Sequence, residues 1–138
     1  SELPVAVSGG ENQPKVDSMI ADILGEIGIP AHSKGCQYLR EAILIAVYDA
    51  VNEMEGLSVT NVLYPWLAKT FDTVPSRVEC AMRHVIEVAW DRCDPDTVQR
   101  FFGCTVSYTK GKPTNSEFIA MIAEKIRLQL QPTEAVQD

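Results

Sequence analysis

The chain has 138 residues, of which 46% are apolar and 22% are charged, and its formal net charge is -7. This length and composition predict one domain with its own hydrophobic core, which excludes a disordered acidic chain and needs no disulfide or metal to hold it together. Since no apolar run approaches the roughly 18 residues of a membrane span, a membrane partner is not expected.

The negative charge is unevenly distributed. Residues 1–58 hold nine acidic against three basic residues, a charge of -6, whereas residues 59–92 are balanced and residues 93–138 carry -1. A high negative charge opposes binding to nucleic acid, but it lies mainly in the first part of the chain. A surface formed by residues after position 58 can therefore still bind an anion.

Helical periodicity begins after a short irregular start. Residues 1–15 contain two prolines and a Gly-Gly pair and are predicted to be a linker. Apolar residues then recur at helical spacing over residues 16–27, and Gly28 and Pro30 end that helix. The second predicted helix covers residues 38–50, and its apolar middle indicates a central position in the core.

Three further helices and one ambiguous segment follow. A helix is expected over residues 59–71, in which Pro65 either kinks the helix or starts a fresh turn. The next is expected over residues 75–91, because its leading proline suits a first helical turn, and a short one over residues 95–102. Residues 104–108 alternate and are β-branched, which favours extended backbone, but a lone strand has no partner.

The last helix is predicted to begin at residues 114–117 and to run to Leu130. Thr114 and Glu117 have the spacing of a capping box, in which each residue's side chain accepts from the other's backbone N–H. These segments together predict an all-α domain of about six helices, with no sheet, over residues 16–131. Residues 132–138 are predicted to be a disordered tail.

The helices predicted over residues 59–71 and 75–91 are typical of a helix-turn-helix, because only three residues, Asp72, Thr73 and Val74, join them. Ala68 supplies the small side chain that two steeply crossing helices need. In this motif the first residues of the second helix face base edges in the major groove. The outward residues there are Ser76, Arg77, Glu79, Cys80, Arg83 and His84.

These residue types suit duplex DNA. Arg83 can form a bidentate contact with guanine O6 and N7, and Glu79 can accept from cytosine N4. Ser76 or His84 can hydrogen-bond a phosphate. A mixed-charge outer face is equally typical of a plain solvated helix, so the pattern alone leaves both interpretations open.

Several strings identify a family. They are EIGIPAH at 26–32, KGCQYLREAI at 34–43, VLYPWLAKTF at 62–71, SRVECAMRHVIEVAWDR at 76–92, FGCTVS at 102–107 and KPTNSEFIAMIAEKIRL at 112–128. Over about residues 16–130 the chain resembles the C-terminal DNA-binding effector domain of the sporulation-initiation response regulators of endospore-forming bacteria. The resemblance implies a six-helix domain that binds a short DNA box through its helix-turn-helix and activates or represses promoters.

The resemblance also assigns residues to this function. It implies that Glu79 and Arg83 read bases. The positions that it places near the DNA backbone are Ser76, Arg77, His84, Lys110, Lys112, Thr114, Asn115 and Ser116. The last three open a helix, where free N–H groups and the helix dipole suit a phosphate. Helix capping is the other role for two of them, Thr114 and Asn115, and both roles can hold at once.

The resemblance further implies protein partners. Phe102, Val106 and Ser107 fall in the segment that contacts a sigma factor of RNA polymerase, although a phenylalanine there is more often part of the core. Neighbouring copies are expected to touch on tandem DNA boxes, as a homodimer. A preceding receiver domain, phosphorylated by a phosphorelay, is expected to regulate the domain, and its location is expected to be the bacterial cytoplasm.

Cys80 departs from the family pattern. The family has S-R-V-E-R-A where this chain has S-R-V-E-C-A. A cysteine cannot make the bidentate guanine contact of an arginine, which is worth about 1–3 kcal/mol of discrimination. A different operator, a lower affinity, the loss of sequence-specific binding and a tolerated drift at one contact all remain open.

Two other classes of function compete with DNA binding. An acidic relative that does not bind DNA and docks on RNA polymerase or a receiver domain is favoured by Cys80 and by the balanced charge of residues 59–92. An enzyme is a weak third, because the chain shows no Ser-His-Asp arrangement or Gly-rich phosphate loop. The four cysteines form no C-x-x-C pair and are read as free thiols. No catalytic residue, cofactor or metal site is therefore expected.

Overall fold

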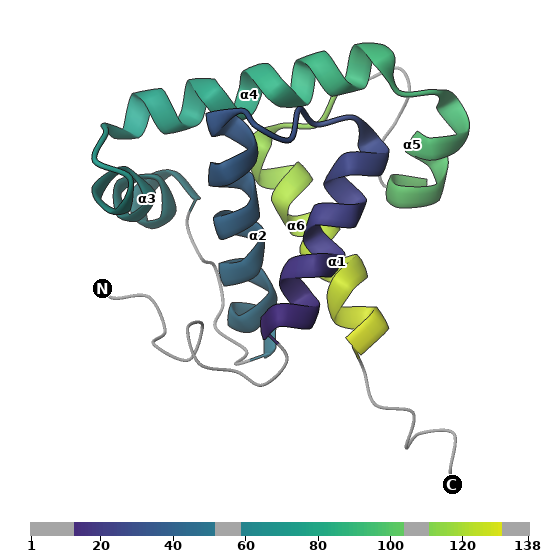
Figure 1. The fold of residues 1–138 in the computed structure, drawn as a ribbon, viewed down its shortest axis with the longest axis horizontal. Coiled ribbons are helices and arrows are strands. Elements are labelled where there is room, and N and C mark those ends of the chain that lie inside the picture. Colours follow the sequence, from purple (N-terminus) through teal and green to yellow (C-terminus); the bar gives the residue numbers. More distant parts are fainter. Residues whose placement is uncertain (1–12, 52–58, 104–110, 131–138) are drawn as a thin grey trace, which may run out of the picture.

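The computed structural model describes residues 13–51, 59–103 and 111–130 (Figure 1). The elements are α1 (Gln13–Ile27), α2 (Lys34–Val51), a π-helical turn η2 (Val59–Leu63), α3 (Tyr64–Thr70), α4 (Pro75–Arg92), α5 (Pro95–Phe102) and α6 (Asn115–Leu130). These ranges contain no strand, which confirms the all-α prediction for the part of the chain described. The predicted extended segment 104–108, the predicted tail 132–138 and most of the predicted linker lie outside these ranges.

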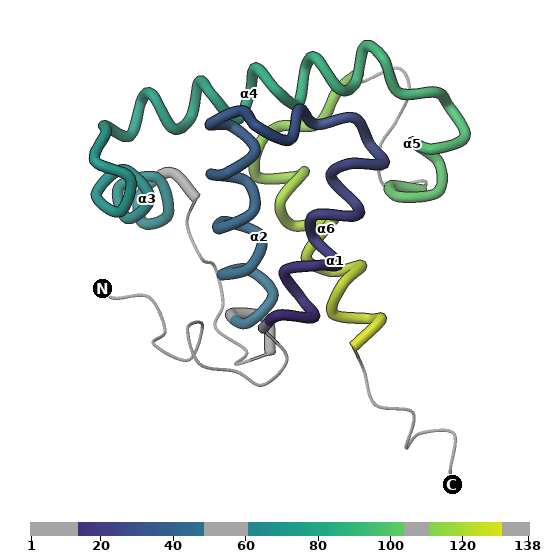
Figure 2. The backbone as a smooth tube through the Cα atoms, viewed as in Figure 1, coloured from purple at the N-terminus to yellow at the C-terminus, as the bar shows by residue number. Residues whose placement is uncertain are grey.

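Helix α2 occupies the centre of the fold, as its apolar sequence predicts. Helices α1 and α6 pack beside it, and α4 lies across the ends of these helices, with α3 at one end of α4 and α5 at the other (Figures 1 and 2). The fully buried side chains of α2 include Leu39, Ala42, Ile43 and Val47. Because α4 packs on the bundle through one side only, its opposite side faces outward.

A glycine allows α2 to begin directly against α4. A Cβ atom placed on Gly35 would lie 2.4 Å from the backbone oxygen of Ala81 and 2.8 Å from both methyl carbons of Val85. Such distances are too short for any side chain, so only glycine permits this approach. Since Lys34 directly precedes Gly35, the same approach brings that lysine to the side of α4.

Helix α1 begins earlier than its apolar stripe predicts. Residues 13–15, expected in the linker, are helical, and Pro14 is tolerated because a first-turn residue needs no N–H partner. The predicted end of α1 is confirmed. Gly28 has a φ of 107°, and the N–H groups of Gly28 and Ile29 both donate to the carbonyl of Leu24, over 3.1 and 2.9 Å.

The region predicted as one helix over residues 59–71 consists of two elements. η2 ends at Leu63, and α3 begins at Tyr64. Pro65 explains this change of winding, because it has no N–H to continue the preceding helix and lies instead in the first turn of α3. The predicted helical region is therefore confirmed over Val59–Thr70, and the effect of Pro65 is a change from π-helical to α-helical winding at Tyr64.

Candidate nucleic-acid interface

Helices α3 and α4 form a helix-turn-helix joined by residues 71–74. Asp72 has a φ of 57°, a left-handed conformation that aspartate tolerates better than most residues. The N–H of Thr73 donates to the carbonyl of Ala68 over 2.8 Å and ends α3. Ala68 is buried, as expected of the small residue between the two helices, and Pro75 lies in the first turn of α4.

One side of α4 is buried and the other is open along the first half of the helix. Its buried residues are Val78, Met82, Val85, Ile86 and Ala89. Its exposed residues between 76 and 84 are Ser76, Arg77, Cys80, Arg83 and His84, with Glu79 half-buried at the edge. At about 100° of rotation per residue, Cys80 lies opposite the centre of the buried stripe. The face predicted to read DNA is therefore exposed, with a cysteine at its centre.

Three residues of this face touch one another. Arg83 Nη1 forms an ion pair with Glu79 Oε2, and Arg83 Nη2 donates to Cys80 Sγ over 3.5 Å. The Cys80 thiol donates to Glu79 Oε1 over 3.4 Å. The hydrogen bond and charge of Glu79 raise the pKa of Arg83, so the guanidinium stays ionised. Because the pair is exposed to water, Arg83 is free to exchange Glu79 for another acceptor at little cost.

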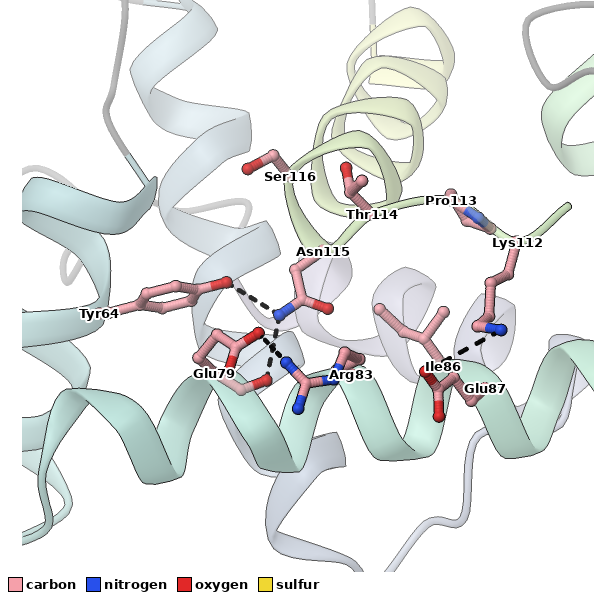
Figure 3. A pocket seen from close by; sticks show the side chains of 10 residues that line it. All are labelled: Tyr64, Glu79, Arg83, Ile86, Glu87, Lys112, Pro113, Thr114, Asn115 and Ser116. Carbon is pink, nitrogen blue, oxygen red and sulfur yellow. Dashed lines mark hydrogen bonds and ion pairs between the residues drawn. The ribbon is translucent and has the colours of Figure 1, made fainter. Parts of the chain in front are cut away.

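A hollow of about 390 Å³ separates the first half of α4 from the start of α6 (Figure 3). Glu79, Arg83 and Glu87 line it from α4, and residues 112–116 line it from the other side. Lys112 reaches toward α4, where its Nζ lies 4.0 Å from Glu87 Oε2. The predicted base readers Glu79 and Arg83 therefore line this hollow, and its two cationic side chains are Arg83 and Lys112.

The start of α6 has the capping box that the sequence predicts. The N–H of Thr114 donates to Glu117 Oε1 over 3.0 Å, and the N–H of Glu117 donates to Thr114 Oγ1 over 3.1 Å. Thr114 and Ser116 are exposed, and the first turn of a helix leaves further N–H groups without helical partners. Thr114 therefore caps the helix through its Oγ1 while the residue stays exposed to solvent.

The side chain of Asn115 turns into the protein rather than toward solvent. Its side chain is buried, with 8% of the residue exposed. Its Nδ2 donates to the Tyr64 hydroxyl over 2.8 Å and to the backbone carbonyl of Glu79 over 3.1 Å. Both amide hydrogens are therefore used inside the protein, because α6 packs onto the helix-turn-helix at this residue.

A second hollow, of about 580 Å³, lies on the opposite flank of α4. Lys34 and Arg77 line it together with the turn of the helix-turn-helix, and neither has an ion-pair partner among the described residues. Sequence reasoning missed Lys34 because it lies 43 positions before Arg77 in the chain. The adjacent Gly35 was the available signal, since a glycine in an apolar helix indicates close approach by another element.

Of the residues predicted to contact a polymerase, only Phe102 lies in the described part of the chain, and it is buried. Its ring lies 5.0 Å from Trp90 and 5.7 Å from Phe118, centroid to centroid. With 3% of the residue exposed, Phe102 packs mainly in the core, and it also lines the hollow between α5 and α6. Val106 and Ser107, like Lys110 among the predicted DNA contacts, lie outside the described residues.

Among the described residues, no helix is both long and apolar enough to cross a membrane.

A comparison with protein families agrees with the features of this interface. The family model described as "Sporulation initiation factor Spo0A C terminal" matches residues 20–126, which include α3, α4 and the start of α6. The chain therefore belongs to the family of sporulation initiation factor Spo0A C-terminal domains, which are DNA-binding effector domains that regulate transcription in sporulation.

Proposed function

We propose that this domain recognises a specific duplex DNA sequence by placing the first half of α4 in the major groove. The observation that supports this most directly is the exposed outward face of residues 76–84. The major groove is about 12 Å wide and admits one α-helix. No described part of the chain has to move to let this face approach the bases.

Glu79 and Arg83 are the proposed base readers. They are one helical turn apart and already in contact, so both reach the same stretch of base edges. Arg83 exchanges its contact with Glu79 for guanine O6 and N7, which releases a Glu79 oxygen to accept from cytosine N4. The pair is thus suited to neighbouring guanine and cytosine edges in the operator.

Cations on both flanks of α4 are proposed to hold the two DNA strands. Lys112 lies on one flank, beside the exposed hydroxyls of Thr114 and Ser116, and Lys34 and Arg77 lie on the other. Phosphates border the major groove on both sides, so a helix inserted between them needs contacts on each flank. This arrangement explains how a chain of charge -7 binds a polyanion.

Cys80 is proposed to change the preferred sequence rather than abolish binding. It lies at the centre of the exposed face, where an arginine would contact guanine. A thiol is small and weakly polar, and it leaves Glu79 and Arg83 in place on either side. We therefore expect this domain to accept several bases at the position that Cys80 faces.

The family also supports proposals about regulation. A preceding receiver domain is proposed to control DNA binding through phosphorylation, and neighbouring copies are proposed to touch on tandem sites. A sigma factor of RNA polymerase is proposed as a partner near α5 and α6, where an open hollow of about 520 Å³ is lined by Phe101, Met121 and Leu128. Leu128 is 54% exposed, an unusual state for a large apolar side chain in this domain.

The alternative function is a protein-interaction module that does not bind DNA. The acidic groups beside the cations favour it, since Glu79 engages Arg83 and Glu87 faces Lys112. The salt dependence of binding separates the two functions. A DNA-binding domain releases counterions, so the logarithm of its affinity falls linearly with the logarithm of salt concentration.

Selection of duplexes from a random pool, at near-physiological salt, tests the proposal. We expect one sequence to be enriched and Arg83→Ala to lower affinity for it by about 5- to 100-fold, with relaxed preference at one base pair. Arg92→Ala, at the far end of α4, is the matched control and should retain the preference. If random duplexes bind the unaltered domain as tightly as any selected one, α4 does not read sequence.

A further inference from the structure

We infer that Asn115 is a positioning residue that sets the base-reading half of α4 in register with the phosphate-contacting residues at the start of α6. The inference rests on the proposed function and adds to it a residue that does not itself touch DNA. It starts from an unusual observation, because Asn115 is the buried polar residue of a core that is otherwise apolar among the described residues.

The amide of Asn115 joins three elements at one point. Its Nδ2 donates to the hydroxyl of Tyr64 in α3 and to the backbone carbonyl of Glu79 in α4 (Figure 3). These partners lie 51 and 36 positions away in the chain. A single side chain on α6 therefore fixes both helices of the helix-turn-helix relative to α6.

The position of this junction relates it to DNA recognition. The carbonyl that accepts from Asn115 belongs to Glu79, whose side chain holds Arg83. The residues on either side of Asn115 are Thr114 and Ser116, which are exposed on the same hollow. Any shift at Asn115 therefore changes the spacing between the base readers and the phosphate contacts.

The chemistry of the site requires an amide. Both partners accept a hydrogen bond from one nitrogen, which a carboxylate or an alkyl side chain cannot supply. Loss of the donor would leave the buried Tyr64 oxygen without it, and an unpaired buried polar group is unfavourable. Burial raises the pKa of Tyr64, so its hydroxyl stays protonated at neutral pH and keeps a neutral oxygen as the acceptor.

Specific and non-specific binding should respond differently to loss of this junction. A bidentate base contact depends on hydrogen-bond distances and angles and weakens steeply when a helix shifts. Phosphate attraction is electrostatic and tolerates a small displacement. A loosened junction should therefore reduce the discrimination between sequences more than it reduces the affinity for DNA in general.

The test compares Asn115→Asp and Tyr64→Phe with the unaltered domain. Asn115→Asp keeps the shape of the side chain but replaces the hydrogen-bond donor with an acceptor. Tyr64→Phe removes only one of the two partners of Asn115. It tests the inference by itself if Asn115→Asp does not fold. Ile122→Val is the matched control, because it weakens the fully buried core of α6 away from the junction. The measured quantity is the ratio of affinities for the selected duplex and for one changed at the base pair that Arg83 reads.

We expect this ratio to fall by about three- to tenfold in Asn115→Asp and by less in Tyr64→Phe, and to stay unchanged in Ile122→Val, at temperatures well below unfolding. Ratios in both junction variants equal to those of the unaltered domain would overturn the inference, as would an equal fall in the control. If the unaltered domain does not discriminate between the two duplexes, the proposed function itself is wrong. That result is seen before any variant is made.

Discussion

At the scale of single residues, α4 has an exposed side that is proposed to touch DNA and a buried side that holds the fold. Arg83 and Cys80 are exposed and in contact with each other, so we expect changes there to alter the proposed recognition of DNA without disturbing the core. Asn115 and Phe102 were also expected at contact surfaces, but both are buried. Residue type alone did not separate these two groups, because polar and aromatic side chains occur in both environments.

Cys80→Arg tests the role of the central position of α4. An arginine there faces the groove and can form the bidentate guanine contact that cysteine lacks. We expect the variant to bind a duplex selected for it about 5- to 100-fold more tightly than the unaltered domain binds the same duplex. Titration of labelled duplexes, with Cys80→Ala as the control for simple loss of the thiol, measures this change. Equal affinity before and after the change would show that position 80 does not face a base.

At the scale of elements, local signals determine where helices begin and end. The capping box at Thr114 and the helix end at Gly28 follow the sequence prediction. These features depend on residues within one turn of each other, so a linear pattern reveals them. The effect of Pro65 was ambiguous from sequence because proline is compatible with both a kink and a first turn.

Gly35→Ala tests the close approach of α2 and α4. The added methyl would overlap the backbone oxygen of Ala81, so we expect a loss of about 1–3 kcal/mol in the free energy of unfolding. Gly25→Ala in α1 is the matched control, since nothing lies within 4 Å of its Cβ position. That variant should gain roughly 0.5–1 kcal/mol through the higher helix propensity of alanine. Denaturant unfolding measures both, and a stable Gly35→Ala variant would contradict the packing described.

Asp94 gives α5 a pH-dependent cap. Its Oδ1 accepts from the N–H of Thr97 over 2.8 Å, and this hydrogen bond lowers the pKa of Asp94. A lowered pKa in the folded state means that the ionised carboxylate stabilises the fold, and that this stabilisation is lost as pH falls through the folded pKa.

The measurement that checks this cap is the melting temperature as a function of pH. Asp94→Ala should melt at a lower temperature than the unaltered domain at about pH 7, and the difference should shrink toward about pH 3. Asp22→Ala, on the exposed face of α1, removes an aspartate that caps no helix and serves as the control. A difference that does not vary with pH would show that the charge of Asp94 has no part in the cap.

At the scale of the whole molecule, the fold gathers cations from distant segments around α4. Lys34 comes from the start of α2 and Lys112 from the residue stretch before α6, and they lie on opposite flanks. The face proposed to meet DNA therefore carries cations on both flanks, although the chain as a whole is acidic. Net charge alone was therefore a poor guide to the partner.

Removing these lysines tests the two flanks. We expect Lys34→Gln and Lys112→Gln each to weaken binding to all duplexes similarly and to reduce the salt slope by about 1, and the double variant to reduce it by about 2. Lys15→Gln, in the first turn of α1, is the control, because that end of α1 lies away from α4 (Figure 1). Affinities measured over a range of salt concentrations check the prediction. A slope unaffected by Lys34→Gln would show that the DNA does not extend over that flank.

The sequence by itself determined the helix content, the helix-turn-helix, the caps and the exposed residues of α4, because each depends on neighbours within a few turns of one another. The tertiary structure decided which distant residues meet. It buried Asn115 against Tyr64 and Glu79, 51 and 36 positions away, and it brought Lys34 to the side of α4. Periodicity reports which side of a helix is apolar but not which helix packs there, so these contacts arise only when the helices assemble.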